Sequence, residues 1–172
     1  MSRRGGGGSR RAVSRRGGGS RRARGIALIV GAVAAYLLTE RGPLDFTWVP
    51  LLLGASYLLA ALTGGERGPL WAPALVLLAF GVGDLLYLGG HLPRGLDEGA
   101  VYIVALGIGV LLCAVAERGG FAVSLAGAGA AVLLAGGFFL LQRRFHGIWE
   151  ESATYAGLLA LWGVWELRPG RG

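Results

Sequence analysis

Long apolar stretches separated by short charged segments dominate the chain from Gly25 onward. Residues 46–65, 99–116 and 119–142 are each free of charged side chains, whereas a soluble domain interleaves charged positions with apolar ones. The hydrocarbon core of a bilayer is about 30 Å thick and takes roughly 20 helical residues. The pattern therefore predicts an all-α fold, an integral membrane bundle of about six transmembrane helices joined by short loops. The expected spans are residues 25–40, 46–64, 69–89, 99–117, 119–142 and 148–166.

Arginine recurs at the ends of these stretches at a nearly constant interval along the chain. The residues in this series are Arg41, Arg67, Arg94, Arg118, Arg143 and Arg168. The interval corresponds to one helix plus one tight turn. Pro or Gly follows several of these arginines and ends a helix, because neither favours helical backbone. The loops are too short to hold an extramembrane domain, so we expect residues 25–168 to form one transmembrane domain.

Residues 1–24 differ sharply in composition from the rest of the chain. All 17 basic residues of the chain are Arg, and nine of them lie in this segment, which contains no acid. These nine are Arg3, Arg4, Arg10, Arg11, Arg15, Arg16, Arg21, Arg22 and Arg24. The net charge of +7 therefore arises from one end of the chain. The segment has too few apolar residues to offset the entropy of ordering, and we expect residues 1–24 to be a disordered cytoplasmic tail.

The distribution of Arg predicts the orientation and the surroundings of the protein. With the N-terminus inside, thirteen Arg lie on the cytoplasmic face and four on the outer face, and without the tail the count is four against four. Both termini are therefore expected in the cytoplasm, with the tail against anionic lipid headgroups. Nucleic-acid binding is not predicted, because the tail has no aromatic residue to stack on bases. The lack of Lys and Asn is typical of a GC-rich bacterial coding sequence, which indicates the inner membrane of a bacterium.

Two other interpretations of the N-terminus remain open. A cleaved signal peptide would combine the basic start, the apolar run from Gly25 and an A-x-A site at Ala32-Val33-Ala34. Apolar residues continue beyond that site, which favours a retained helix. A twin-Arg export signal is suggested by four Ser-Arg-Arg units, but Gly or Ala follows each of them instead of a large apolar residue.

Asp84 is the only ionisable acid well inside an expected span. A carboxylate in the middle of a membrane costs at least about 2.5–3.5 kcal/mol, so such residues usually face a cavity or a partner. One hypothesis is a proton- or cation-handling carboxylate. The alternative is a structural residue near the outer interface, which bonds Tyr87 one turn away or the cationic His91 and Arg94 in the following turn.

Small residues recur at four-residue intervals in five of the six expected helices. Gly31, Gly109 and Gly127 belong to three of these stripes. Lipid tails are as apolar as Leu, so membrane helices associate by close approach, which small residues permit. The stripes predict a compact bundle, and they leave open a homo-oligomer or a contact with another membrane protein.

The remaining polar residues do not predict catalysis. His146 and Glu150 would share a helix face, but Arg143 and Arg144 lie beside them and would repel a metal cation. No nucleophile, base and orienting group coincide in one layer of the bundle, so we expect no enzyme activity and no cofactor.

One hairpin resembles a known family. Ala27-Leu28-Ile29-Val30-Gly31 opens the first expected helix, a Gly42-Pro43-Leu44 turn follows, and Trp48-Val49-Pro50 precedes a Leu-rich stretch with Gly54. This arrangement, mainly within residues 25–62, is similar to the transmembrane hairpin of the LiaI/LiaF-like membrane proteins linked to cell-envelope stress. The resemblance implies a non-catalytic regulatory or scaffolding membrane protein. The leading expectation is thus a membrane protein that acts through helix contacts, and the alternative is a small transporter or channel that uses Asp84.

Overall fold

The computed structural model describes residues 14–66, 68–93, 95–144 and 152–168, and within these ranges all regular structure is helical. The helices are α1 (Ser14–Tyr36), α2 (Val49–Gly64), α3 (Trp71–Leu88), α4 (Glu98–Arg118), α5 (Leu125–Arg144) and α6 (Ser152–Leu167). A π-helical turn, Leu37–Arg41, extends α1, and a 3₁₀ turn, Phe46–Trp48, leads into α2. The prediction of an all-α chain is confirmed.

Four helical segments are long and apolar enough to cross a membrane: Arg21–Arg41, Phe46–Gly64, Trp71–Leu88 and Glu98–Arg118. The other two helices differ from the expected spans. Helix α5 is Leu125–Arg144 and begins after the expected start of the fifth span, and α6 has 16 residues. The described residues therefore contain four clear candidate spans, and the predicted count of about six is not confirmed. The expected fifth span began at residue 119, but residues 119–124 form the turn that precedes α5.

The first helix begins earlier than expected. Residues 14–24 belong to α1, although the composition predicted a disordered tail over residues 1–24. Arg is a good helix former, and Arg21 and Arg24 gain an ion pair with α6 that no local pattern reveals. Arg3, Arg4, Arg10 and Arg11 lie outside the described residues, while Arg15, Arg16 and Arg22 are part of the helix.

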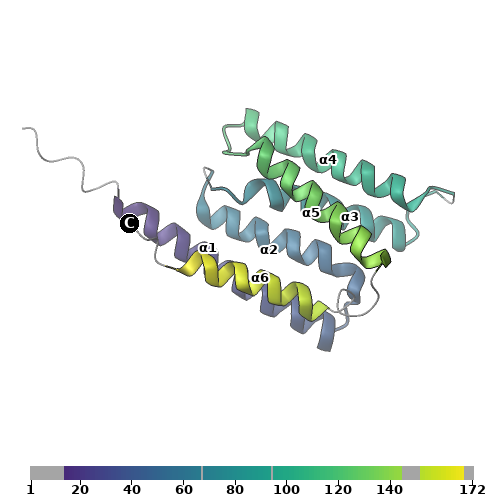
Figure 1. The fold of residues 1–172 in the computed structure, drawn as a ribbon, viewed down its shortest axis with the longest axis horizontal. Coiled ribbons are helices and arrows are strands. Elements are labelled where there is room, and N and C mark those ends of the chain that lie inside the picture. Colours follow the sequence, from purple (N-terminus) through teal and green to yellow (C-terminus); the bar gives the residue numbers. More distant parts are fainter. Residues whose placement is uncertain (1–13, 67, 94, 145–151, 169–172) are drawn as a thin grey trace, which may run out of the picture.

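Five helices lie side by side in the order α6, α1, α2, α3, α4, and α5 lies against one side of this row, mainly on α3 (Figure 1). Neighbours along the chain run antiparallel. We call the end with segments 65–70 and 119–124 the terminal end, because α6 also ends there. The opposite end, with segments 42–45 and 89–97, is the distal end. At the terminal end the Ala122 N–H donates to the Glu66 carbonyl at 2.8 Å, so the two segments there are joined.

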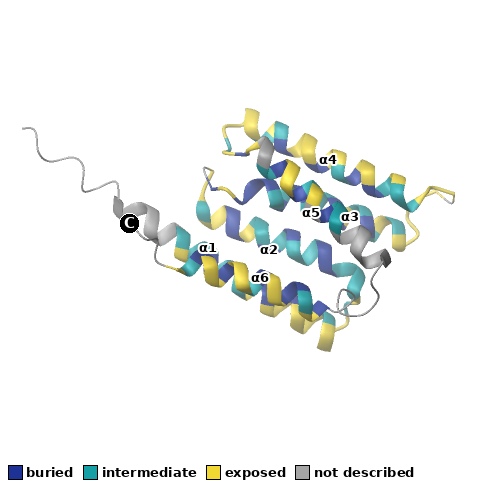
Figure 2. Ribbon diagram, in the orientation of Figure 1, coloured by how far each residue is buried: buried dark blue, intermediate teal, exposed yellow. Residues whose placement is uncertain are grey.

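The core is built mostly from small residues. Ala60, Ala61 and Ala74 have no exposed surface, and each described helix carries buried positions where it contacts its neighbours (Figure 2). The closest backbone approach in this layer joins α2 to α3. A Cβ atom at Gly54 would lie 2.6 Å from the Leu78 nitrogen, and one at Gly81 would lie 2.5 Å from the Leu51 nitrogen. These two glycines let the helices pack backbone against backbone, which is how helices associate in lipid.

Candidate functional site

Asp84 lies on α3 one turn before the helix ends, and its residue is only 7% exposed. The Tyr102 hydroxyl of α4 donates a hydrogen bond to Asp84 Oδ1 at 2.6 Å. This is the range of charge-assisted O–H···O bonds, which are roughly twice as strong as neutral ones. The carboxylate therefore has a buried interhelical partner, and it joins α3 to α4 near the distal end.

Aromatic rings and further acids surround this bond. The Phe80 ring lies 5.1 Å from the Tyr102 ring, and the Tyr87 ring lies 6.4 Å from it on another side. The Glu98 and Asp45 carboxylates act electrostatically on Asp84. Tyr87, one of the partners expected from spacing, thus packs against the residue that bonds Asp84.

The local sequence explains how α4 presents Tyr102. Asp97 has extended backbone, and its side chain accepts the Ala100 N–H at 3.2 Å, which caps the start of α4. Tyr102 follows in the second turn and reaches Asp84 on α3. Among the described residues, no group of three His, Cys, Asp or Glu side chains is arranged to hold a metal ion. The side chains described at this site can form hydrogen bonds and carry charge, and most of the ionisable ones are carboxylates.

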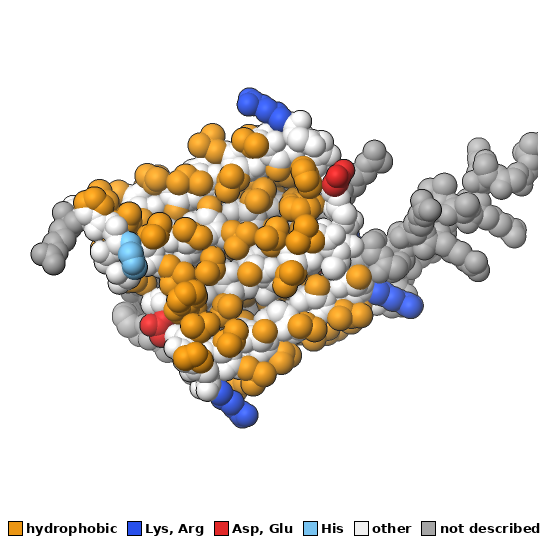
Figure 3. Space-filling model, turned by 180° about the vertical axis from the view of Figure 1, so that it is seen from behind, with side chains coloured by type: hydrophobic (Ala, Val, Ile, Leu, Met, Phe, Trp, Pro, Cys, Tyr) orange, Lys and Arg blue, Asp and Glu red, His pale blue; other side chains and the backbone are white. Residues whose placement is uncertain are grey.

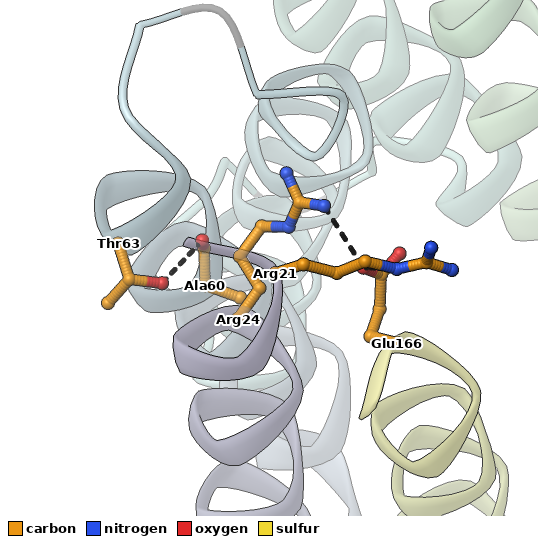
Figure 4. A network of polar contacts seen from close by, with 5 residues as sticks. All are labelled: Arg21, Arg24, Ala60, Thr63 and Glu166. Atoms are coloured by element: carbon orange, nitrogen blue, oxygen red, sulfur yellow. Dashed lines mark hydrogen bonds and ion pairs between the residues drawn. The ribbon is translucent and has the colours of Figure 1, made fainter. Parts of the chain in front are cut away.

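A second polar cluster lies at the terminal end between α1 and α6. Arg24 donates to Glu166 Oε2 at 3.1 Å, and Arg21 lies 3.5 Å from the same oxygen (Figure 4). The Arg24 and Glu166 side chains are 13% and 10% exposed, whereas Arg21 is 39% exposed. Arg24 packs over the end of α2, since a Cβ atom at Gly64 would lie 2.8 Å from Arg24 Cδ. The cluster therefore fixes part of the Arg-rich segment to the last turn of α6.

At the distal end, the Ser152 hydroxyl donates a hydrogen bond to the Glu40 carboxylate and joins the same two helices. Between the two polar contacts the backbones approach closely. A Cβ atom at Gly25 would lie 2.8 Å from the Gly163 carbonyl oxygen. Glu40 and Glu166 lie at the ends of the expected first and last spans. Their partners are more than 100 residues away along the chain, so spacing carried no signal for either contact.

The three glycines singled out by the stripes lie at helix contacts of different kinds. A Cβ atom at Gly109 would lie 2.8 Å from the Val76 Cα, at the contact of α4 with α3. One at Gly31 would overlap the Ser56 side chain of α2. Gly127 lies in the first turn of α5, where its N–H bonds the Ser124 hydroxyl at 2.9 Å, and it faces Ala72 of α3.

Large apolar side chains cover the outer surface between the two polar ends. Ile103 and Leu111 of α4 are 72% and 66% exposed, and Leu161 of α6 is 68% exposed. Seen from behind, hydrophobic side chains spread across the middle of the molecule, and the charged side chains that are drawn stand near its margins (Figure 3). An apolar belt between charged ends is the surface that a bilayer requires.

Comparison with known protein families, characterised proteins and solved structures finds no match to this chain. The resemblance of residues 25–62 to the LiaI/LiaF-like hairpin therefore stays a prediction.

Proposed function

We propose that the chain is a non-enzymatic, multi-spanning protein of the bacterial inner membrane, which acts through lateral contacts of its helices with a second copy or with another membrane protein. One observation carries the proposal. The two buried acids among the described residues, Asp84 and Glu166, are engaged in contacts between helices of the bundle, whereas the large apolar side chains at its two edges face outward. The surface available to a partner is thus the lateral one, within the membrane.

The α1–α6 pair supports six membrane crossings in place of four. Polar contacts join Arg24 to Glu166 at one end of the pair and Glu40 to Ser152 at the other. Sixteen residues of α1 and its extension separate these contacts, which is about 24 Å of helix. If α1 crosses the membrane, α6 crosses beside it over nearly the same depth. The apolar part of α6 is short, and the ion pair of Glu166 with Arg24 allows this charged end to lie near the membrane surface.

An even number of crossings places both termini on the same side, and the Arg-rich segment favours the cytoplasm for that side. The terminal end would then face anionic headgroups of the inner leaflet, which attract Arg. The resemblance to LiaI/LiaF-like proteins suggests a role in envelope homeostasis. A gene for a two-component system beside the coding sequence would support that role.

Site-specific photo-cross-linking in membranes tests the proposal. A photoreactive residue at Leu111 or Ile103 probes the α4 edge, one at Leu161 probes the α6 edge, and one at the buried Ala105 is the matched control. We expect a discrete adduct from one edge and none from Ala105. An adduct of twice the chain mass identifies a second copy. If neither edge produces an adduct, the proposal is overturned.

The alternative function is a small transporter or channel that uses Asp84 as an intramembrane carboxylate. The observation in its favour is a buried acid that holds a tyrosine hydroxyl and has Glu98 nearby, one turn from the distal end. This hypothesis requires the charge of Asp84, not only its hydrogen bond. The Asp84→Asn variant described below separates the two requirements.

A further inference from the structure

The polar cluster between α1 and α6 at the terminal end carries more positive than negative charge. Arg24 and Arg21 approach the same oxygen, Glu166 Oε2, at 3.1 Å and 3.5 Å (Figure 4). We call these three residues the Arg–Glu cluster. Two guanidinium groups share one carboxylate, and no other described acid forms an ion pair with either arginine. The cluster therefore keeps one positive charge that the described residues do not neutralise.

The hydrogen bonds of the two arginines are also incomplete within the described part of the chain. A guanidinium group has five N–H donors. The buried Nε of Arg24 has no hydrogen-bond partner among the described residues. Arg21 meets Glu166 through its Nε, so the forked end of its guanidinium extends beyond the carboxylate, and its side chain is 39% exposed (Figure 4). A free guanidinium fork is the group that binds phosphate through two parallel hydrogen bonds.

The Arg–Glu cluster lies at the depth where lipid headgroups begin. About 24 Å of helix separates Arg24 from Glu40 at the distal end, which is close to the thickness of the hydrocarbon core, and Arg21 is nearly one turn further out. On α6, Trp165 is 60% exposed, and the Arg168 guanidinium lies 5.6 Å from the centre of its ring. Because Trp is enriched at membrane interfaces, α6 indicates the same depth as α1.

An apolar surface continues from the cluster toward the middle of the bundle. Leu161 and Val164 precede Glu166 on α6 and are 68% and 47% exposed. Helix α6 is the last in the row and has α1 as its main neighbour, so lipid can reach this edge (Figure 1). Cations above an exposed apolar strip match a phospholipid, which has a phosphodiester above its acyl chains. A free phosphate or an acidic peptide would use only the cations.

We infer that the Arg–Glu cluster binds the phosphodiester of one anionic phospholipid from the leaflet at the terminal end, through the exposed fork of Arg21. Glu166 positions the two guanidinium groups, and the lipid supplies the missing negative charge. A lipid with a net negative charge is favoured over a zwitterionic one, because the ammonium group of the latter adds a cation beside the arginines. This site deepens the contact of the terminal end with anionic headgroups and rests on the membrane insertion proposed above, but not on the lateral partner.

Native mass spectrometry of the full chain in mild detergent tests the site, with dioleoyl phosphatidylglycerol and dioleoyl phosphatidylethanolamine as probes. Arg21→Gln removes the fork, and Arg24 still pairs with Glu166. The matched control is Arg22→Gln, which removes the same charge from the next residue, an exposed one. We expect the parent to bind the first phosphatidylglycerol about fivefold more tightly than phosphatidylethanolamine, as for one Arg near an anionic surface. Arg21→Gln should lose this preference, and Arg22→Gln should keep it.

Three outcomes would overturn the site. Equal loss in Arg21→Gln and Arg22→Gln would mean that the lipid is attracted only by the overall charge of the segment. Equal binding of the two lipids by the parent would mean that the cluster does not select an anionic headgroup, and this comparison needs no variant. Displacement of phosphatidylglycerol by inorganic phosphate would make the ligand a free phosphate group.

Each variant must match the parent in circular dichroism and size-exclusion profile. The test is separate from that of the proposed function, because neither Arg21→Gln nor Arg22→Gln changes Ile103, Leu111 or Leu161, the edge positions used for cross-linking. Loss of lipid selectivity with intact cross-links overturns only the lipid site, and loss of cross-links with intact selectivity overturns only the lateral partner.

Discussion

At the scale of single residues, the position of Asp84 shows what local spacing can and cannot predict. An acid in an apolar run is visible in the sequence, and the cost of burying it predicts that it has a partner. The partner, Tyr102, is 18 residues away and belongs to the next helix. Tyr87 is one turn away and was one of the three partners expected from the sequence, but its ring packs against Tyr102. The need for a hydrogen bond was predictable, whereas the donor depended on how α3 and α4 pack.

The Asp84–Tyr102 bond leads to a prediction about charge. Asn retains a side-chain oxygen that accepts the Tyr102 hydroxyl, and it removes a charge that is costly to bury. We therefore expect Asp84→Asn to unfold in detergent at the same denaturant concentration as the parent or at a higher one, with an unchanged cellular phenotype. Tyr102→Phe leaves the carboxylate without its donor and should destabilise the bundle by about 1.5–3 kcal/mol.

The two variants must be compared in one assay. A well-folded Asp84→Asn protein that has lost its cellular phenotype would contradict the structural role and make transport or channel activity the leading function. Equal stability of Tyr102→Phe and the parent would show that the hydrogen bond contributes nothing to the packing of α3 against α4.

At the scale of helices, close contacts depend on glycines whose importance cannot be read from composition. A coding sequence rich in Gly supplies many glycines, and only some lie at contacts. Gly109 meets Val76 of α3, while Gly107, two residues earlier on the same helix, has no atom within 4 Å of an added Cβ. Both occur in the same sequence context. The direction in which each one faces follows from which side of α4 packs on α3.

This pair provides a matched test of packing. Gly109→Leu should overpack the contact with α3 and cost roughly 1–3 kcal/mol. Gly107→Leu, in open space on the same helix, should cost less and can even stabilise the protein, because Leu favours helix over Gly. Thermal unfolding in a mild detergent measures both. If the two variants unfold at the same temperature, the face that carries Gly109 is lipid-facing. Leu111→Ile, at an exposed position, serves as a further mild control.

The contact between α1 and α6 leads to a prediction about how the stability of the bundle depends on charge. Glu166→Leu leaves the mostly buried Arg24 guanidinium without its partner, and we expect a loss of about 1.5–3 kcal/mol. Glu166→Gln keeps an acceptor oxygen and should lose less. Glu117→Leu changes an exposed acid in the last turn of α4 and is the control. Denaturant unfolding measures the free energy of unfolding of all three variants. If Glu166→Leu and Glu117→Leu lose the same stability, the ion pair has no stabilising role.

At the scale of the whole molecule, we expect the membrane topology to depend on the distribution of Arg. Deleting residues 2–24 leaves four Arg on each side, so we expect mixed or inverted insertion. Deleting only residues 2–13 removes four Arg and leaves nine against four, so the parent orientation should persist. Reporter fusions at the C-terminus of both truncations measure the outcome. A uniformly cytoplasmic C-terminus after the longer deletion would show that Arg counting does not decide this topology.

The sequence by itself determined that the chain is helical and apolar enough for a membrane, because bilayer thickness and helix rise set the length of each apolar run. It also predicted the approximate bounds of α2, α3 and α4, because Pro, Gly and charged residues mark helix ends locally. The tertiary structure decided the start of α1 and the pairs Asp84–Tyr102, Arg24–Glu166 and Glu40–Ser152. Those features depend on which helices become neighbours. In lipid that choice is made by shape and by a few buried polar contacts, and neither has a periodic signature in the chain.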